Sequence, residues 1–437
     1  MKINKSIQYS RNSLEILFFK RNTPTAPLPT SLGCFLGRDC PEMQHGWHVA
    51  ALGVSIVVAL YFWPMTIPDA LIDPAMRRAV KTFEQNRLPD WLARAGTRLM
   101  LSRQLADQEH EGGPEGSEAQ REYVRRFIAD LRTRDIAEQT AAANEQHYEV
   151  DARFYDLVLG KHRKYSCALF PSVDAPASTA LDLLAAAEER MLLLYAERAQ
   201  IAAESSLRVL DLGCGWGSVT LWFAAKFPNC SFVGLSNSKS QRTYILAQAK
   251  ARGLTNVDVL TGDISTFELS STGFAKFDRV ISVEMLEHMK NYEKLLQKIS
   301  DDVLVSDGLL FVHIFVHRTF PYHFTTRGLA TDWMAQHFFS GGTMPADDTL
   351  LEFQKHLHLV ERWRVDGRHY SLTLEAWLQQ MDLRIDEVQA LFAQIYGKEN
   401  VTLWTARWRA FFFVCSELFK FNDGREWFVA HYLFRNS

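Results

Sequence analysis

Three ionisable side chains stand close together near the middle of this 437-residue chain: Glu284, Glu287 and His288. They follow residues 278–283, a short apolar run that predicts a strand. A carboxylate or an imidazole can attract a cationic amine and accept the proton that the amine must lose before it attacks as a nucleophile. These residue types in this spacing therefore indicate proton transfer at an acceptor site. The alternative is that Glu287 and His288 are an exposed pair at a helix start, without a catalytic role.

A second cluster lies in VLDLGCGWG, residues 209–217, where Gly213 and Gly215 follow another apolar run. Glycine lets the backbone pass close to a ligand and adopt a positive φ, although a purely structural turn is the alternative. Asp211 precedes the glycines, and a carboxylate there disfavours a pyrophosphate at the following helix N-terminus. The cationic methionine portion of S-adenosylmethionine tolerates that carboxylate much better. The turn therefore favours a methyl donor over NAD.

Two further positions bear on the cofactor. A second strand of this kind normally ends in an acid that binds ribose hydroxyls, but GLSNSKSQ, residues 234–241, contains none. After the third predicted strand comes Asp263, which could accept a hydrogen bond from an adenine amino group. A plain helix N-cap is the alternative for Asp263.

The elements that would position these residues alternate along the second half of the chain. Strands followed by helices of ten or more residues predict an α/β, Rossmann-like fold, with a mostly parallel sheet and helices on both faces. Together with the turn that favours a methyl donor, this predicts a Rossmann-like class I methyltransferase fold. Ligands bind at the carboxyl ends of the strands in such sheets, where the acceptor residues and the glycines would lie. The strands are predicted at 207–212, 231–235, 257–260, 278–283 and 309–316, and the helices at 217–227, 239–252 and 291–301.

The stretch 319–339 interrupts the predicted sheet after its fifth strand and is dense in aromatic residues. A lid over the acceptor is predicted at this place in the fold. Aromatic faces in such a lid would bind a cationic amine favourably, by about 0.5–2 kcal/mol each. For any single aromatic, ordinary core packing is the alternative. The residues concerned are Phe320, Tyr322, Phe324, Trp333, Phe338 and Phe339.

The N-terminal part has a different pattern. Residues 1–46 carry six Lys or Arg against three acids and predict a disordered basic leader. Residues 47–63 contain no charged side chain and as a helix would span roughly 25 Å, which predicts a single membrane anchor over 47–64. A buried helix, a signal peptide, or an extension ahead of Met65 are the alternatives. Residues 65–150 predict a helical region, and 151–437 the methyltransferase domain.

Two helical runs are expected in that region, at 67–105 and 117–150. The first has helix starts at Pro68 and Pro89, and a polar break over 110–116 separates the two.

Composition excludes some classes of partner. The net charge of -3 provides no broad basic surface for nucleic acid. The six cysteines form no CxxC pair and no cluster with zinc spacing, so we expect no metal site and reduced thiols. We expect a cytoplasmic catalytic domain, either free or attached to a membrane through 47–63. The sequence leaves the oligomeric state open, with a homodimer as one option.

Several long motifs resemble a known family. FDRVISVEMLEHMKNYEKLL, residues 277–296, resembles the signature of the cyclopropane fatty acid synthase superfamily, and its EMxEHMKNY form resembles the coclaurine N-methyltransferase branch more closely. The resemblance covers roughly residues 80–437 and implies an S-adenosylmethionine-dependent N-methyltransferase acting on a small cyclic or aromatic amine. Further stretches resemble the branch in the same order, at 155–170, 311–324, 337–345 and 408–434.

The resemblance implies roles for individual residues around the cofactor and the acceptor. Tyr165 and Ser166 match positions that close over the cofactor, and Gln241 would bind the ribose in place of the missing acid. Gly213 and Gly215 match the glycines beneath the cofactor. The acceptor-site residues of the branch match Glu284, Glu287 and His288.

The resemblance also predicts a substrate pocket. Trp408 and Phe411 match pocket aromatics of the alkaloid branch, and we expect His313 and Tyr370 to belong to the same pocket. Arg407 stands where that branch has a tyrosine. A cation there would repel an amine or pair with an acid or phosphate, so the substrate is expected to differ from the branch's own.

Two other functions stay open. Cyclopropane synthases modify lipids with a bicarbonate base, and the positions resembling its ligands are Cys167, Glu287, His313 and Tyr370. Glu284 stands where that branch has a small residue, and its carboxylate would crowd and repel bicarbonate, which favours an amine acceptor. A catalytically silent cofactor-binding module is the third possibility, and the intact acceptor set argues against it.

Overall fold

The computed structural model describes residues 69–138, 151–326 and 332–436. The predicted leader at 1–46 and the predicted anchor at 47–64 lie outside these ranges. Within them, no helix combines the length and the apolar character needed to cross a bilayer.

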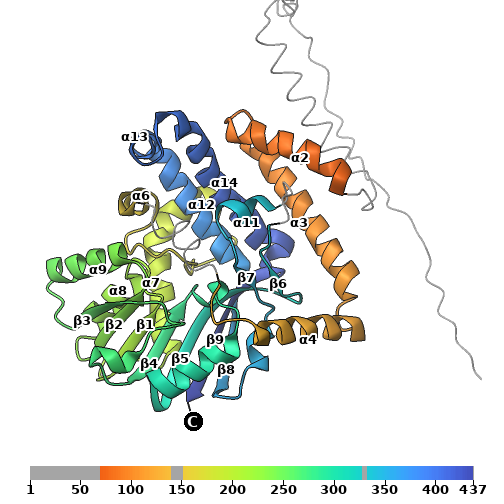
Figure 1. Cartoon of the computed structure of the whole chain (residues 1–437). Coiled ribbons are helices and arrows are strands. Elements are labelled where there is room, and N and C mark those ends of the chain that lie inside the picture. The colour runs from red at the N-terminus through yellow and green to blue at the C-terminus, as the bar shows by residue number, and fades with distance from the viewer. Residues whose placement is uncertain (1–68, 139–150, 327–331, 437) are drawn as a thin grey trace, which may run out of the picture. The chain divides into compact units, whose positions relative to one another are not determined.

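A seven-stranded sheet organises the second half of the chain, with the strand order β3-β2-β1-β4-β5-β9-β8 (Figure 1). Strands β3, β2, β1, β4 and β5 run parallel to one another, and β9 runs antiparallel between β5 and β8. The predicted mostly parallel α/β sheet is therefore confirmed. The strands are β1 Arg208–Leu212, β2 Ser231–Ser236, β3 Val257–Thr261, β4 Phe277–Val283, β5 Leu304–His317, β8 Leu357–Val365 and β9 Trp427–Asn436.

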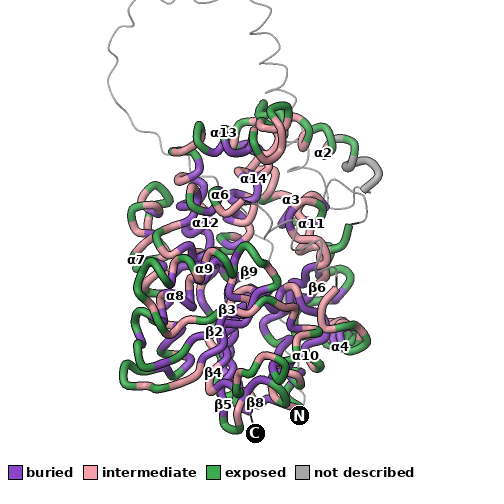
Figure 2. The backbone as a smooth tube through the Cα atoms, turned by 60° about the vertical axis from the view of Figure 1, so that its left-hand side comes forward, coloured by how far each residue is buried: buried purple, intermediate pink, exposed green. Residues whose placement is uncertain are grey.

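Helices follow the strands as the spacing predicted. The apolar side chains of these helices pack on the buried strands, which appear as the purple centre of Figure 2. The five predicted strands and three predicted helices of this half are confirmed, with small shifts at their ends. The helices around the sheet are α6 Ala152–Val158, α7 Ala180–Arg198, α8 Ser218–Lys226, α9 Lys239–Ala251 and α10 Tyr292–Lys298.

The N-terminal helices begin where proline predicted, directly after Pro68 and Pro89. They are α2 Asp69–Glu84, α3 Asp90–Gly112 and α4 Glu118–Thr133. The prediction that the last helical run continues from 117 to about 150 is wrong at 134–138, and 139–150 lie outside the described residues. The helix ends because Asn291 Nδ2 donates to the carbonyls of Arg132 and Arg134, and Ala137 forms a bridge with Met289.

A group of C-terminal helices packs on one end of the sheet (Figure 1). Helix α14 contacts α12, α13, α2 and α3, so the two ends of the described chain share one apolar layer. Sequence patterns had not assigned these elements. They are α12 Gly367–Leu383, α13 Ile385–Ile395 and α14 Val401–Lys420.

The predicted lid region folds into short elements between β5 and β8: β6 Tyr322–His323, α11 Trp333–His337 and β7 Thr343–Met344. Strands β6 and β7 pair antiparallel as a separate two-stranded sheet. Phe320 and Phe338 are buried in the core, so for these two aromatics the packing alternative is correct.

Candidate functional site

A cavity of about 440 Å³ opens at the carboxyl ends of β1 and β4. A smaller pocket of about 80 Å³ shares part of its wall. Because both lie at the strand ends, the structure brings together residues from distant parts of the chain. The predicted residues on the larger wall are Tyr165, Ser166, Asp211, Gly213, Gly215, Gln241, Glu284, His288, Tyr370 and Phe411, and Asp263 lines the smaller pocket.

The glycine turn after β1 forms part of both walls. Gly213 and Gly215 have φ angles of 83° and 51°, a region that favours glycine. A Cβ on Gly213 would lie 2.6 Å from the Met285 Cγ atom, so packing requires glycine there. A Cβ on Gly215 would meet no protein atom within 4 Å among those described. Gly215 therefore leaves an open stretch of wall against which a ligand could lie.

The polar side chains near this turn are only partly used by the protein. Asp211 accepts hydrogen bonds from the Thr220 backbone nitrogen (3.1 Å) and hydroxyl (2.6 Å), and burial raises the pKa of Asp211 to about 6. Gln241 Oε1 accepts from Ser236 Oγ at 2.6 Å. Gln241 Nε2 is buried and has no partner within the described part of the chain. It is a donor available to a ligand oxygen.

Asp263 caps the turn at residues 264–266 and not the start of a helix, so the helix N-cap alternative is wrong. Its Oδ1 atom accepts from the backbone nitrogen (2.9 Å) and hydroxyl (2.7 Å) of Ser265, as a turn-capping side chain does. The residue also lines the smaller pocket together with Gly213 and Gln241. Capping and ligand binding are therefore compatible at this position.

Glu284 is held at the end of β4 by donors from three elements. Its Oε1 atom accepts from the Cys167 backbone nitrogen (2.9 Å) and lies 3.0 Å from His313 Nε2. Its Oε2 atom accepts from the Tyr370 hydroxyl at 2.5 Å. Cys167, His313 and Tyr370 therefore all contact this carboxylate, and they are three of the four residues that resemble the bicarbonate ligands of cyclopropane synthases.

The backbone and the surroundings of Glu284 are unusual. Its φ of 50° lies in the left-handed region, which costs a non-glycine residue of order 1 kcal/mol and is found at functional sites. Burial raises the pKa of Glu284 to about 7, while Lys164 and the Tyr370 hydroxyl act in the opposite direction. The carboxylate therefore titrates close to neutral pH, as a general base does.

The structure separates Glu287 from His288. Glu287 is buried away from the cavity, where its Oε1 accepts from the Phe315 backbone nitrogen at 2.9 Å. Burial, followed by the nearby Glu284, raises the pKa of Glu287 well above its usual range. His288 lines both pockets and stacks on Phe339, with ring centroids 5.0 Å apart. The exposed-pair alternative therefore does not apply to Glu287.

The predicted substrate-pocket residues divide in the same way. Tyr370 and Phe411 line the cavity, whereas His313 and Trp408 are buried behind it. Trp408 packs on Phe411 with ring centroids 5.7 Å apart and so supports the wall from behind. His313 is linked to the cavity through its contact with Glu284.

Arg407 does not line the cavity. Its Nε atom donates to Glu84 Oε1 of α2 at 2.8 Å, and its guanidinium lies over the Trp404 ring. Arg407 was expected either to repel an amine or to pair with an acid or phosphate, and it pairs with the acid Glu84. Its charge is therefore neutralised by α2 and is not presented to a ligand.

Sequence patterns missed two features of the cavity. The first is Lys164, which is buried on the wall and donates to Ser166 Oγ (2.5 Å) and the Cys167 carbonyl (2.7 Å). Burial lowers the pKa of Lys164 to about 8. Its place next to the predicted Tyr165 was a usable signal, but a lysine is normally assigned to the surface.

The second missed feature is the apolar outer wall. Helices α2 and α3 supply it, which no local motif indicated. Their contributions include Met76, Val80, Phe83, Leu92, Met100 and Leu101, and the predicted lid adds Tyr322, Phe324, Trp333 and Phe339.

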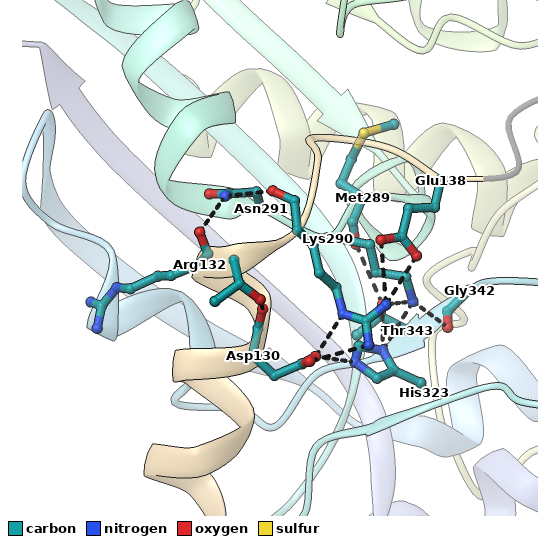
Figure 3. A network of polar contacts seen from close by, with 11 residues as sticks. Asp130, Arg132, Glu138, Met289, Lys290, Asn291, His323, Gly342 and Thr343 are labelled. Carbon is teal, nitrogen blue, oxygen red and sulfur yellow. Dashed lines mark hydrogen bonds and ion pairs between the residues drawn. The ribbon is translucent and has the colours of Figure 1, made fainter.

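A cluster around Lys290 joins the lid to α4 (Figure 3). Lys290 Nζ lies 2.9 Å from His323 Nδ1 and donates to the Gly342 carbonyl (3.1 Å) and to Thr343 Oγ1 (2.9 Å). His323 Nε2 lies 3.0 Å from Asp130 Oδ2. Burial lowers the pKa of Lys290 to about 8 and that of His323 to about 4.

The outer end of this cluster reaches the smaller pocket. Arg134 binds Asp130 at 2.7 Å and Glu138 at 3.0 Å, and Glu138 lines the pocket. We call Lys290, His323, Asp130, Arg134 and Glu138 the Lys290 cluster. It fixes the loop after His288 to both the lid and α4.

The comparisons with known proteins agree with this geometry. The sequence profile described as mycolic acid cyclopropane synthetase matches residues 136–425. The (S)-coclaurine N-methyltransferase of Thalictrum flavum subsp. glaucum is 36% identical over 82% of this chain and 95% of its own length. The pavine N-methyltransferase of the same plant is 34% identical over 83% of this chain and 98% of its own length.

A solved structure extends the similarity to three dimensions. Coclaurine N-methyltransferase bound to N-methylheliamine and SAH matches with a TM-score of 0.75 and 34% sequence identity. The match covers 83% of this chain and 100% of that one. This chain therefore spans nearly the full length of these relatives.

Proposed function

The chain belongs to the mycolic acid cyclopropane synthetase family, and we propose that it is an S-adenosylmethionine-dependent N-methyltransferase for an amine with an apolar body. The observation that carries the proposal is the Glu284 carboxylate on the cavity wall. A carboxylate offers about four lone-pair sites, and in the described part of the chain three donors occupy Glu284. One acceptor position remains for an ammonium group. The similarity to amine N-methyltransferases supports the same function.

The residues around the glycine turn fit the methyl donor. Gly215 leaves room for close approach, and the unpartnered Gln241 Nε2 suits a ribose oxygen. Asp211 and Asp263 offer carboxylates to the amino groups of the methionine and adenine portions. S-adenosylmethionine, when bound, supplies a methyl group on a sulfonium from which an aligned neutral nitrogen can displace it.

Glu284 prepares the acceptor for this displacement. The amine enters as an ammonium ion and gives one proton to Glu284 Oε2, which frees the nitrogen lone pair. The neutral nitrogen would then displace the methyl group from the bound donor, so that one nitrogen–carbon bond replaces one sulfur–carbon bond and a neutral thioether remains. His313 and Tyr370 donate to the carboxylate beforehand, so little reorganisation is needed.

We assign different parts to the other predicted acceptor residues. His288 borders both pockets and would confine the amine between the donor and Phe339. Glu287 supports β5 through the Phe315 backbone nitrogen and acts as a neutral acid. Glu284 is then the base of the reaction.

The outer wall indicates the rest of the substrate. Apolar side chains of α2, α3 and α14 surround the part of the cavity away from Glu284. Such a wall favours an aromatic or aliphatic body by about 25 cal/mol for each Å² of apolar surface buried. Arg407 does not oppose this, because Glu84 pairs with it outside the cavity.

Lipid cyclopropanation is the second candidate, and one observation weighs against it. Cys167, His313 and Tyr370, which resemble bicarbonate ligands, already bind the Glu284 carboxylate. A tethered carboxylate therefore occupies the contacts that a free bicarbonate would need. Glu284 would also repel that anion.

Full-length protein with labelled S-adenosylmethionine distinguishes these functions. Two acceptors are offered. One is heliamine, which is N-methylheliamine without its N-methyl group, and the other is vesicles of an unsaturated phospholipid. We expect label in the amine and none in the lipid. Label in the lipid alone would contradict the proposal, and label in neither would favour a silent cofactor-binding module.

A membrane anchor at 47–63 and a homodimer remain predictions. Flotation of the full chain with phospholipid vesicles tests the anchor, and light scattering of the same protein tests the dimer. Recovery of the chain only in the vesicle-free fraction would contradict the anchor.

A further inference from the structure

A line of hydrogen bonds connects Glu284 to a half-buried arginine at the end of α7. Arg198 Nη1 lies 2.5 Å from His431 Nδ1, and His431 Nε2 lies 2.9 Å from His313 Nδ1. His313 Nε2 in turn lies 3.0 Å from Glu284 Oε1. We call these four residues the Glu284 chain. Only Glu284 among them lines the cavity.

Strand register places the middle of this chain. His313 of β5 is the register partner of His431 of β9, and Trp363 of β8 is the next partner of His431. Register partners on neighbouring strands lie on one face of a sheet. The Arg198 guanidinium lies 4.7 Å from the centre of the Trp363 ring. The outer end of the chain is therefore held in place.

The chemistry of Arg198 fixes the direction of every bond in the chain. A guanidinium carries only donors, so His431 Nδ1 must accept and the His431 proton must be on Nε2. His431 then donates to His313 Nδ1, which places the His313 proton on Nε2, facing Glu284. Burial lowers the pKa of both histidines well below their usual range, so each carries one ring proton.

Tyr195 alone would not impose this direction. Its hydroxyl lies 2.9 Å from His313 Nδ1, but a hydroxyl can donate or accept. Arg198 cannot accept, and it reaches His313 only through His431. If the tautomer were reversed, His313 Nε2 would present a lone pair to Glu284, and only a protonated carboxyl could donate to it.

We propose that Arg198 and His431 are positioning residues for methyl transfer, which hold His313 in the tautomer that donates to Glu284 and so keep this carboxylate ionised on the cavity wall. The kinetic consequence rests on the proposed function. The ionisation of Glu284 does not, because it can be measured without turnover.

Other titratable groups also face Glu284, and none of them is changed in the test below. Lys164 lowers the pKa of Glu284 and remains the nearby cation in every variant. The groups are Lys164 and Cys167 ahead of α7, Tyr195 on α7, Glu287 after β4, Tyr370 on α12 and Cys415 on α14.

Infrared titration of the full chain tests the proposal. The carboxyl stretch of Glu284 is isolated by subtracting the spectrum of Glu284→Gln and is followed against pH in each background. Arg198→Met and His431→Phe should each raise the midpoint by about one pH unit, because the carboxylate loses one donor. Arg198→Lys should bring the midpoint most of the way back to the wild-type value, since the lysine ammonium also carries only donors.

Arg279→Met is the matched control. Arg279 donates from Nε to the Ala199 carbonyl at 2.8 Å, so its loss disturbs the same helix end without removing a donor from the Glu284 chain. Its midpoint should equal that of the wild type. A folded Arg198→Met or His431→Phe protein with the wild-type midpoint would overturn the proposal. So would an equal shift in Arg279→Met.

Kinetics with heliamine test the positioning role of Arg198 separately from the proposed methyltransferase function. At about pH 7, kcat/KM of Arg198→Met should fall about fivefold and recover at higher pH, because a raised pKa lowers the ionised fraction. A merely structural role would lower kcat/KM equally at every pH, and this result would contradict positioning. If no protein methylated heliamine while the infrared midpoint moved, positioning would stand and the proposed function would fail.

Discussion

Two networks lie beside the loop after β4, and each places neutral histidine between a cation and a carboxylate. The Glu284 chain has two such histidines and the Lys290 cluster has one. In the Glu284 chain, Arg198 is at the outer end and the carboxylate is at the cavity. In the Lys290 cluster the order is reversed, with Lys290 inside and Asp130 at the outer end (Figure 3). The inner end is therefore negative in the Glu284 chain and positive in the Lys290 cluster, although both networks use the same types of group.

The inner ends of the two networks explain the difference. The Lys290 ammonium has three protons, and His323, Thr343 and the Gly342 carbonyl accept all of them. The Glu284 carboxylate lines the cavity, and the hydrogen bonds of the described residues leave one of its acceptor positions unused. A fully satisfied charge stabilises the protein, whereas a partly satisfied one can act on a ligand. The comparison therefore predicts that Glu284 affects activity most and Lys290 affects stability most.

The largest effect is expected for Glu284→Gln. Its kcat/KM for heliamine should fall roughly 10²- to 10⁴-fold, the usual contribution of a general base. Wild-type kcat/KM should rise as pH rises through about 7, because the ionised Glu284 is the active form. Initial rates across pH, with circular dichroism to confirm folding, measure both.

Tyr370→Phe is the companion variant, because it keeps the Glu284 carboxylate and removes one of its donors. A loss of about tenfold is expected, corresponding to one hydrogen bond to a charged group. If Glu284→Gln lost less than Tyr370→Phe, Glu284 would not be the base.

Lys290→Met should act mainly on stability. The free energy of unfolding should fall by about 2–4 kcal/mol, because His323, Thr343 and the Gly342 carbonyl lose a buried donor. Urea denaturation measures this change. Lys294→Met is the control, since Lys294 is exposed and its loss should change stability by under about 0.5 kcal/mol. A larger loss of activity in folded Lys290→Met than in Glu284→Gln would break the comparison.

Acid should weaken the Lys290 cluster through the protonation of His323. Burial lowers the pKa of His323 from 6.5 to about 4, so the unfolded chain takes up this proton more readily. The contribution of His323 to stability is then complete above about pH 6.5 and is lost as pH falls towards 4. His323→Gln cannot titrate, so its unfolding free energy should depend less steeply on pH. Equal slopes for the two proteins would contradict a neutral buried His323.

The smallest effect is expected for Arg407→Tyr, which changes a pair that belongs to neither network. Arg407 and Glu84 are each under a fifth exposed, and their loss should cost roughly 1 kcal/mol of stability. The KM for heliamine should change less than about twofold, since neither residue lines the cavity. A large change in KM would mean that charge at the outer wall selects the substrate.

The cofactor side shows how far local sequence reaches. A strand, a glycine turn and a helix lie within 208–226, so their spacing predicted the fold at Gly213 and Gly215. The open wall at Gly215 follows from the same local turn. Gln241 was identified by resemblance, and its unpartnered Nε2 atom is visible only in three dimensions.

The acceptor side depends on contacts between distant segments. Glu284, Glu287 and His288 are near neighbours in sequence, yet only Glu284 and His288 reach the cavity. The short turn after β4, with its positive φ at Glu284, directs Glu287 towards β5 instead. Sequence spacing could not separate these residues, because the separation depends on a strained backbone angle.

The sequence alone determined the mostly parallel sheet, the cofactor turn and the set of ionisable residues after β4, because each depends on patterns within a few tens of residues. Tertiary structure decided what those residues do. Donors from β5, α12 and the segment before α7 meet at Glu284, and α2 supplies both an apolar wall and the partner of Arg407. Hydrogen bonding and desolvation act over a few ångströms in space, whatever the distance along the chain, so only the folded protein could assign the base.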